Sequence, residues 1–149
     1  MGFRLAEAER QREDRRVLQE EGQAAKEAAL QAALEDQSTD FNSAKENIQS
    51  KKTEYLDKLK TNKNFSKRRL GLVTRRIDAE FATASLSAQK TAFDRGTQLT
   101  TQADNTALDS FRQTLRTSAP GSAPYMLAEA GVKNTFDQAT KENRKLNYT

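Results

Sequence analysis

The 149-residue chain contains no cysteine and no histidine. Without cysteine there is no disulfide framework, no thiolate nucleophile and no cysteine-bound zinc. Without histidine the chain lacks the commonest general base and the commonest metal ligand. Because the usual nucleophile–base pairs draw on these two residues, we expect no enzymatic activity, no catalytic residue, no cofactor and no metal site.

Large apolar residues are also scarce. Leu, Ile, Val and Phe together make up 26 of the 149 residues, which is below the roughly 20% at which disorder becomes common. The mean hydropathy is −0.92, and no run of about 18 apolar residues exists that would form a transmembrane helix. Such a chain cannot bury a thick core of its own, so we expect packing against other subunits to stabilise it.

Proline is nearly absent. The only two prolines, Pro120 and Pro124, both lie in the stretch 117–124, "TSAPGSAP", which predicts a loop. Alanine, glutamine, glutamate, lysine and arginine dominate the first part of the chain, and all five favour helix. We therefore predict an elongated all-α protein of three to four long helices, stabilised by packing between subunits.

Two polar stretches divide the helical part. "QSTD" at 37–40 can end one helix and cap the next, and "TNKNFS" at 61–66 is the second candidate break. The expected organisation is an elongated helical region over 1–116, the loop at 117–124, and a short C-terminal helix with a polar tail over 125–149. Within 1–116 the expected helices run over about 4–36, 40–61 and 66–116.

Apolar and small residues recur at helical spacing in the third predicted helix. Their spacing fits an eleven-residue repeat as well as a seven-residue one, and strict heptads do not persist. This pattern favours straight or mildly right-handed packing in a multi-chain bundle or ring over a regular coiled coil. The predicted packing stripe consists of Leu70, Val73, Ile77, Phe81, Ala84 and Ala88.

The positive charge is concentrated in one window. The chain has 25 Lys and Arg against 21 Asp and Glu; without the eight basic residues of 58–76, 17 basic residues face 21 acids. The window therefore supplies the whole positive excess. We predict an anion- or partner-binding patch formed by Lys58, Lys60, Lys63, Lys67, Arg68, Arg69, Arg75 and Arg76.

Several partners fit this basic patch, and the sequence leaves them open. On a helical wheel the basic residues flank the apolar stripe on both sides, as in a packed helix with solvated shoulders. They can neutralise nucleic-acid phosphates, or an acidic protein surface such as 4–36, which carries nine acids and six basic residues. An anionic membrane surface is the third alternative.

Three stretches of the chain resemble, in composition, the internal virion (ejection) proteins of short-tailed phages. They are "GQAAKEAALQAALED" at 22–36, "KRRLGLVTRRIDAEFATASLSAQ" at 67–89 and "TQLTTQADNTALDSF" at 97–111. The resemblance implies a helical protein stored in the capsid near the portal–tail axis. Such proteins leave with the genome and help to build a conduit across the host envelope. This chain lacks the strongly apolar helix that some of them use to enter a membrane.

These observations favour a non-enzymatic structural or adaptor subunit of a large assembly, specifically a phage virion component of the internal or portal–tail region. Its expected partners are copies of itself and other subunits, with DNA as a further partner through the basic patch. The expected location is the virion. The alternative is a basic helical nucleic-acid-binding or scaffolding protein, for which a cytoplasmic location is expected.

Overall fold

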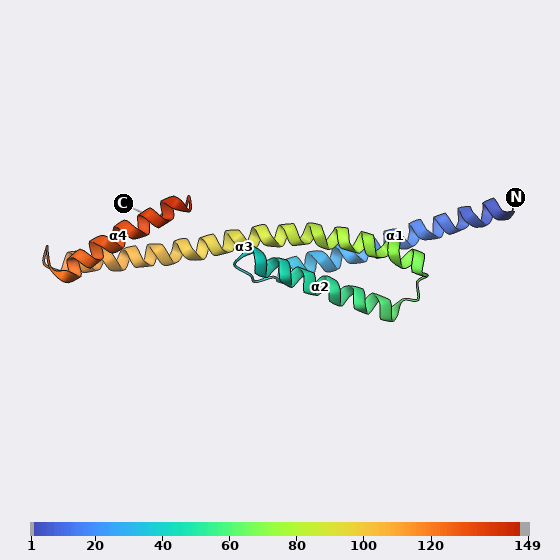
Figure 1. Cartoon of the computed structure of the whole chain (residues 1–149), viewed down its shortest axis with the longest axis horizontal. Helices are drawn as coiled ribbons and strands as arrows, with labels where there is room; N and C mark the ends of the chain where they lie inside the picture. Colours follow the sequence, from blue (N-terminus) through green and yellow to red (C-terminus); the bar gives the residue numbers. More distant parts are fainter. Residues whose placement is uncertain (1, 147–149) are drawn as a thin grey trace. The chain divides into compact units, whose positions relative to one another are not determined.

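A computed structural model describes residues 2–146, which form four α-helices and no strand. The all-α prediction is confirmed (Figure 1). The ends of the first three helices differ from the expected ones by one or two residues, and the last helix begins inside the expected loop. The four helices are α1 (Gly2–Glu35), α2 (Phe41–Asn62), α3 (Lys67–Thr117) and α4 (Ala123–Lys141).

Side-chain caps fix where two of the helices begin. The carboxylate of Asp40 accepts a hydrogen bond from the Ser43 backbone N–H at 2.8 Å and so caps α2. The hydroxyl of Ser122 accepts from the Tyr125 N–H at 3.4 Å and caps α4, whose first turn contains Pro124. Before this cap, Gly121 has φ +85°, a left-handed conformation that glycine adopts without steric cost.

The packing between helices divides the chain into two compact units. Unit 1 runs to Phe93 and unit 2 begins at Asp94, so α3 contributes its first part to unit 1 and the remainder to unit 2. The sequence predicts a division at the loop 117–124 instead. Proline and glycine mark where a helix ends, whereas the compact units depend on which other helix lies alongside each part of α3.

Unit 1 is a bundle of three helices. Asp14 of α1 contacts Arg68 of α3, whereas Lys63, at the end of α2, contacts Glu21 of α1. Lys52 of α2 pairs with Asp78 of α3 at 3.4 Å. Figure 1 shows that α1 and α3 run in the same direction and that α2 runs opposite to both. The buried core contains seven alanines among Val17, Ala25, Ala29, Ala32, Ala44, Ile48, Leu59, Val73, Ile77, Phe81, Ala84, Ala88 and Ala92.

Unit 2 is a helical hairpin in which α4 runs back along the last part of α3. Its buried apolar side chains are Leu108, Ala128 and Ala139. The helices approach closely at Gly131, where an added Cβ would lie 2.5 Å from the Phe111 ring. The hairpin therefore depends on small residues and a narrow contact, and it buries few large side chains.

The threonine hydroxyls in the polar second part of α3 bond to the backbone of the same helix. Thr100, Thr106, Thr114 and Thr117 each donate to the carbonyl four residues earlier, at 2.9–3.2 Å. These local bonds satisfy the hydroxyls without ending the helix. A segment rich in Thr, Gln and Ser can thus stay helical although it buries little.

Candidate functional site

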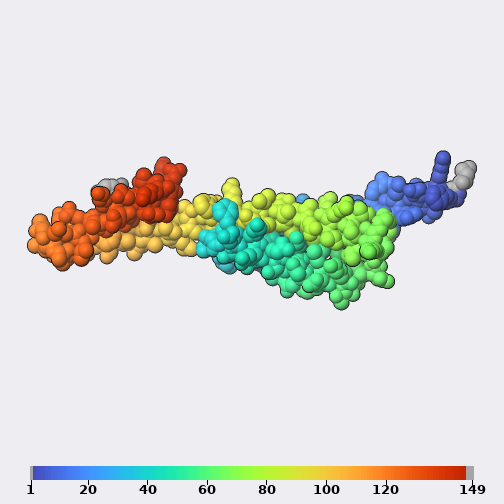
Figure 2. All heavy atoms as spheres, in the orientation of Figure 1, coloured from blue at the N-terminus to red at the C-terminus, as the bar shows by residue number. Residues whose placement is uncertain are grey.

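One end of unit 1 gathers most of the positive charge of the chain. We define the basic end as residues 2–16 of α1 together with 58–76, which cover the end of α2, the linker 63–66 and the start of α3. The first residues of α1 run past the α2–α3 connection (Figures 1 and 2). The basic end holds thirteen Lys and Arg residues against four acids, a net charge of +9.

Asp14 neutralises two arginines of the predicted patch. Arg68 donates to both oxygens of the Asp14 carboxylate, at 2.7 and 3.2 Å, and Arg69 Nε donates to Oδ1 at 3.1 Å. Asp14 is only 9% exposed. The hydrogen bond from Arg68, supported by Arg69, holds the pKa of Asp14 below its ordinary value. For these two arginines, the anionic partner is a carboxylate of the same chain.

Two further patch residues also have acidic neighbours. Lys63 Nζ lies 3.7 Å from Glu21 of α1, and Arg76 Nε lies 3.2 Å from Glu80 one turn along α3. The Arg76 side chain also covers Gly22, where an added Cβ would lie 2.8 Å from Nε. Half of the predicted patch therefore serves to hold the three helices of unit 1 together.

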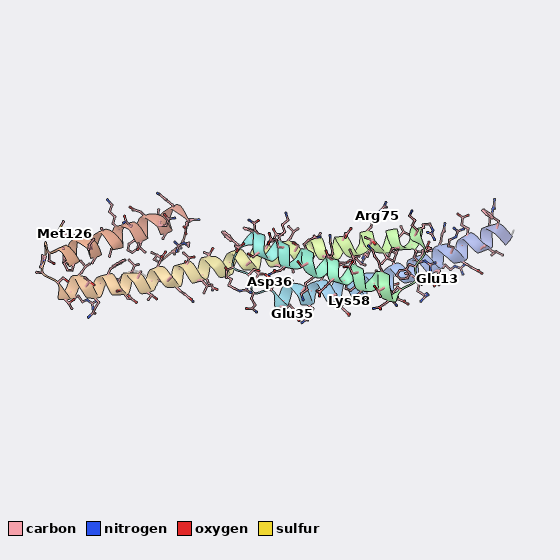
Figure 3. The ribbon with its side chains drawn as sticks, turned by 60° about the horizontal axis from the view of Figure 1, so that its bottom comes forward. Glu13, Glu35, Asp36, Lys58, Arg75 and Met126 are labelled. Carbon is pink, nitrogen blue, oxygen red and sulfur yellow. The ribbon has the colours of Figure 1, made fainter. Side chains whose placement is uncertain are left out.

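The other half of the predicted patch faces solvent. Lys58, Lys60, Lys67 and Arg75 are exposed, and no ion pair within residues 2–146 involves any of them. In Figure 3, Arg75 on α3 and Lys58 on α2 lie at opposite edges of the bundle. Lys58 borders a groove of about 240 Å³ shared with Glu35 and Glu54. Because Arg75 and Lys58 lie at opposite edges (Figure 3), the eight residues of the predicted patch do not form one face.

The basic end contains five cations outside the window 58–76, and four of them form no ion pair among the described residues. Arg4, Arg10, Arg12 and Arg15 of α1 are exposed and have no ion pair among the described residues. Acidic residues lie among these arginines in the sequence, so residues 2–16 contain no unbroken run of positive charge like that of 58–76. A helical wheel of α1 could have indicated these cations, because it shows that residues adjacent in the sequence point in different directions around the helix axis.

The predicted packing stripe lies inside unit 1. Val73, Ile77, Phe81, Ala84 and Ala88 are buried, and the partly buried Leu70 packs against them. The Phe81 ring lies 5.7 Å, centroid to centroid, from the ring of Tyr55 on α2. We expected this stripe to meet other subunits, but it is occupied by α1 and α2 of the same chain.

A second polar cluster lies in unit 2 and has no counterpart in the sequence predictions. The Arg144 side chain is 4% exposed and lies 2.6 Å from Asp104 of α3 and 2.6 Å from Glu142. The hydrogen bond to Asp104 holds the pKa of Arg144 above its ordinary value. Arg144 thereby fastens the segment after α4 to α3, where the sequence indicated only a polar tail.

The described residues contain no arrangement typical of a metal centre or a membrane span. Within residues 2–146 no group of three or more His, Cys, Asp or Glu side chains could hold a metal ion. No helix in this range is long and apolar enough to cross a bilayer. A scan against protein-family models finds no match, and no curated protein or solved structure is significantly similar to the chain.

Proposed function

We propose that this chain is a non-enzymatic structural or adaptor subunit of a large assembly, in which neighbouring subunits cover its exposed apolar side chains. The observation that carries the proposal is the balance of large apolar residues. Within residues 2–146, seven buried apolar side chains are larger than alanine, whereas ten large apolar side chains are exposed. A protein that acts alone is expected to show the reverse balance.

Several exposed apolar side chains lie together. Leu30 and Leu34 are one turn apart on α1, at 52% and 79% exposure, so they lie on the same side of the helix. Met126 and Leu127 are both exposed at the start of α4 and point about 100° apart around the helix. Clustered apolar side chains in contact with water are typical of protein interfaces. These two places are the expected contacts with other subunits.

The narrower proposal is that the assembly is the virion of a short-tailed phage, with the chain in its internal or portal–tail region. Its support is the compositional resemblance of the Ala-rich, Thr-rich and Gln-rich helices to ejection proteins. Finding the chain in purified particles by mass spectrometry tests this narrower statement. A chain found only outside the particles contradicts it.

The mass of the native particle tests the broader proposal. Light scattering on the purified chain across a range of concentrations should report a multimer. The double variant Leu30→Gln with Leu34→Gln should shift the distribution toward the monomer and leave the helical content unchanged, whereas Lys26→Gln, an exposed change on the same helix, should not. A monomer at every concentration with a sharp, cooperative melt would refute the proposal.

A further inference from the structure

The basic end keeps an excess of unpaired positive charge after all of its ion pairs are formed. Asp14, Glu21 and Glu80 pair with patch residues, and Arg16 pairs with both Glu13 and Glu20. Two acids of the basic end then have no ion pair among the described residues. Eight exposed cations likewise have none, namely Arg4, Arg10, Arg12, Arg15, Lys58, Lys60, Lys67 and Arg75.

The rest of unit 1 carries the opposite charge. Residues 17–57 and 77–93 contain eleven acids against five basic residues, a net charge of −6, compared with +9 at the basic end. Charge separated in this way attracts a polyanion toward one end of the unit and repels it from the other. Within unit 1, an anionic partner is therefore directed to the basic end.

Part of α1 presents its cations in a row. At 100° per residue, Arg4, Arg12 and Arg15 fall within a sector of about 80°, and Glu7 and Glu9 fall outside it. The row covers eleven helical steps, or about 16 Å. Each strand of duplex DNA carries about five phosphates over that length. The row therefore suits a partner with a line of closely spaced phosphates better than it suits a partner with a single carboxylate.

Two other polyanionic partners fit less well. A single strand would need several exposed aromatic rings for base stacking, but of the two aromatic residues in the basic end Phe65 is partly buried against the core and Phe3 alone is exposed. A membrane surface would need an apolar helix face, but the exposed Phe3 and Leu5 point about 160° apart at 100° per residue.

We propose that the basic end binds the phosphate backbone of duplex DNA without regard to sequence. The row of Arg4, Arg12 and Arg15 on α1 binds the phosphates, the other unpaired cations of the basic end attract the duplex by their charge, and Arg68 and Arg69 remain with Asp14. This binding goes beyond the subunit role proposed above and rests on a different observation. A monomer that binds DNA would refute only the assembly, and a multimer that does not bind DNA would refute only this inference.

Fluorescence anisotropy with a labelled random-sequence duplex, over a series of salt concentrations, tests the proposal on the full chain. Arg12, Arg15, Lys60 and Lys67 are changed together to Gln; all four are exposed and form no ion pair among the described residues, so the helical content should not change. We expect binding roughly tenfold weaker or more at low salt, with the salt slope reduced by about 0.9 for each phosphate that the variant no longer neutralises. The matched control removes four exposed lysines elsewhere: Lys26, Lys45, Lys90 and Lys133, each to Gln.

The control variant should keep the affinity within about twofold, because it removes the same charge outside the basic end. An equal loss in both variants, or no binding by the unchanged chain at about 50 mM salt, overturns the proposal. Polyglutamate bound as tightly as DNA would point to an acidic protein partner and also overturns it. Asp14→Asn gives a test in the opposite direction: by releasing Arg68 and Arg69 it should tighten DNA binding and steepen the salt slope.

Discussion

Units 1 and 2 share one helix but differ in what holds that helix in place. In unit 1, α3 packs against two helices and buries Val73, Ile77 and Phe81 at 0–2% exposure. In unit 2 it packs against α4 alone, and Leu108 is its one buried large side chain among the described residues. The number of neighbouring helices, more than the helical pattern of α3 itself, therefore sets how much each part of α3 buries.

The two units also use charge differently. In unit 1 the ion pairs of Asp14 with Arg68 and Arg69 lie at the edge of an apolar core to which all three helices contribute. In unit 2 the Arg144 side chain is nearly buried between more exposed acids, and the core contains three apolar side chains among the described residues. We infer that apolar burial dominates the stability of unit 1 and that polar interactions contribute a larger share in unit 2.

The largest expected effect is the loss of the Phe81 ring from unit 1. Phe81→Ala removes a side chain that is 2% exposed and contacts Tyr55, so it should cost about 3–5 kcal/mol of unfolding free energy. Leu86→Ala on the same helix, where Leu86 is 70% exposed, should cost less than about 0.5 kcal/mol. Urea unfolding followed by circular dichroism compares them; similar losses would mean that the stripe is not the core of unit 1.

Removing the Arg144 side chain tests how much polar interactions contribute to the stability of unit 2. Arg144→Met should destabilise the hairpin by about 1–3 kcal/mol, because Asp104 loses a charged, nearly buried partner. Lys145→Met is the matched control, since Lys145 is exposed beside it. Amide hydrogen exchange of α4 should accelerate in the first variant alone. Unchanged exchange in both would show that the cluster contributes nothing to the hairpin.

Two glycines offer a paired test of packing. A Cβ at Gly131 would meet the Phe111 ring at 2.5 Å, so Gly131→Ala should lower stability by about 1 kcal/mol or more, despite the better helix propensity of alanine. At Gly22 the three atoms nearest to an added Cβ belong to the Arg76 side chain, which can move, and Gly22→Ala should gain up to about 1 kcal/mol. Thermal melts of the two variants should shift in opposite directions, and a shift in the same direction would contradict the packing described here.

The smallest expected effect concerns the pH dependence contributed by Asp14. Its folded-state pKa lies below the unfolded value of ~3.9 because of the hydrogen bond from Arg68. The stabilisation is therefore present above that unfolded value and is lost as the pH falls through the lower folded value. Asp14→Asn should be less stable than the unchanged chain near pH 6, and the gap should narrow below about pH 4. A gap that is constant with pH would rule out the charged pair as its source.

Helical periodicity gave the correct fold class and helix positions close to those observed. Val73, Ile77 and Phe81 stand out in the sequence because their spacing is local, and a local repeat needs no knowledge of neighbouring helices. The pairing of Asp14 with Arg68 joins residues 54 positions apart, so no local pattern could predict it. The burial of Arg144 depends in the same way on α4 running back along α3.

The basic end was only partly predictable for a related reason. An unbroken run of positive charge revealed Lys60 and Lys67, but acids nearby in the sequence concealed Arg12 and Arg15. Where acidic and basic residues alternate in the sequence, the helix can still place them on different faces, so a run of charge along the chain does not reveal a charged face. The division into units inside α3 was equally inaccessible, because it depends on where α2 and α4 lie and not on any residue of α3.

Amide hydrogen exchange as a function of protein concentration tests the central claim most directly. We infer that the core of unit 1 holds that unit together, whereas the hairpin of unit 2, with Leu108 as its one large buried apolar side chain among the described residues and with Met126 and Leu127 exposed, depends on neighbouring subunits. We predict that protection of residues 123–141 rises steeply with concentration and that protection of residues 73–92 changes little. Equal protection of both segments at every concentration would contradict the claim, since the hairpin would then be stable without partners.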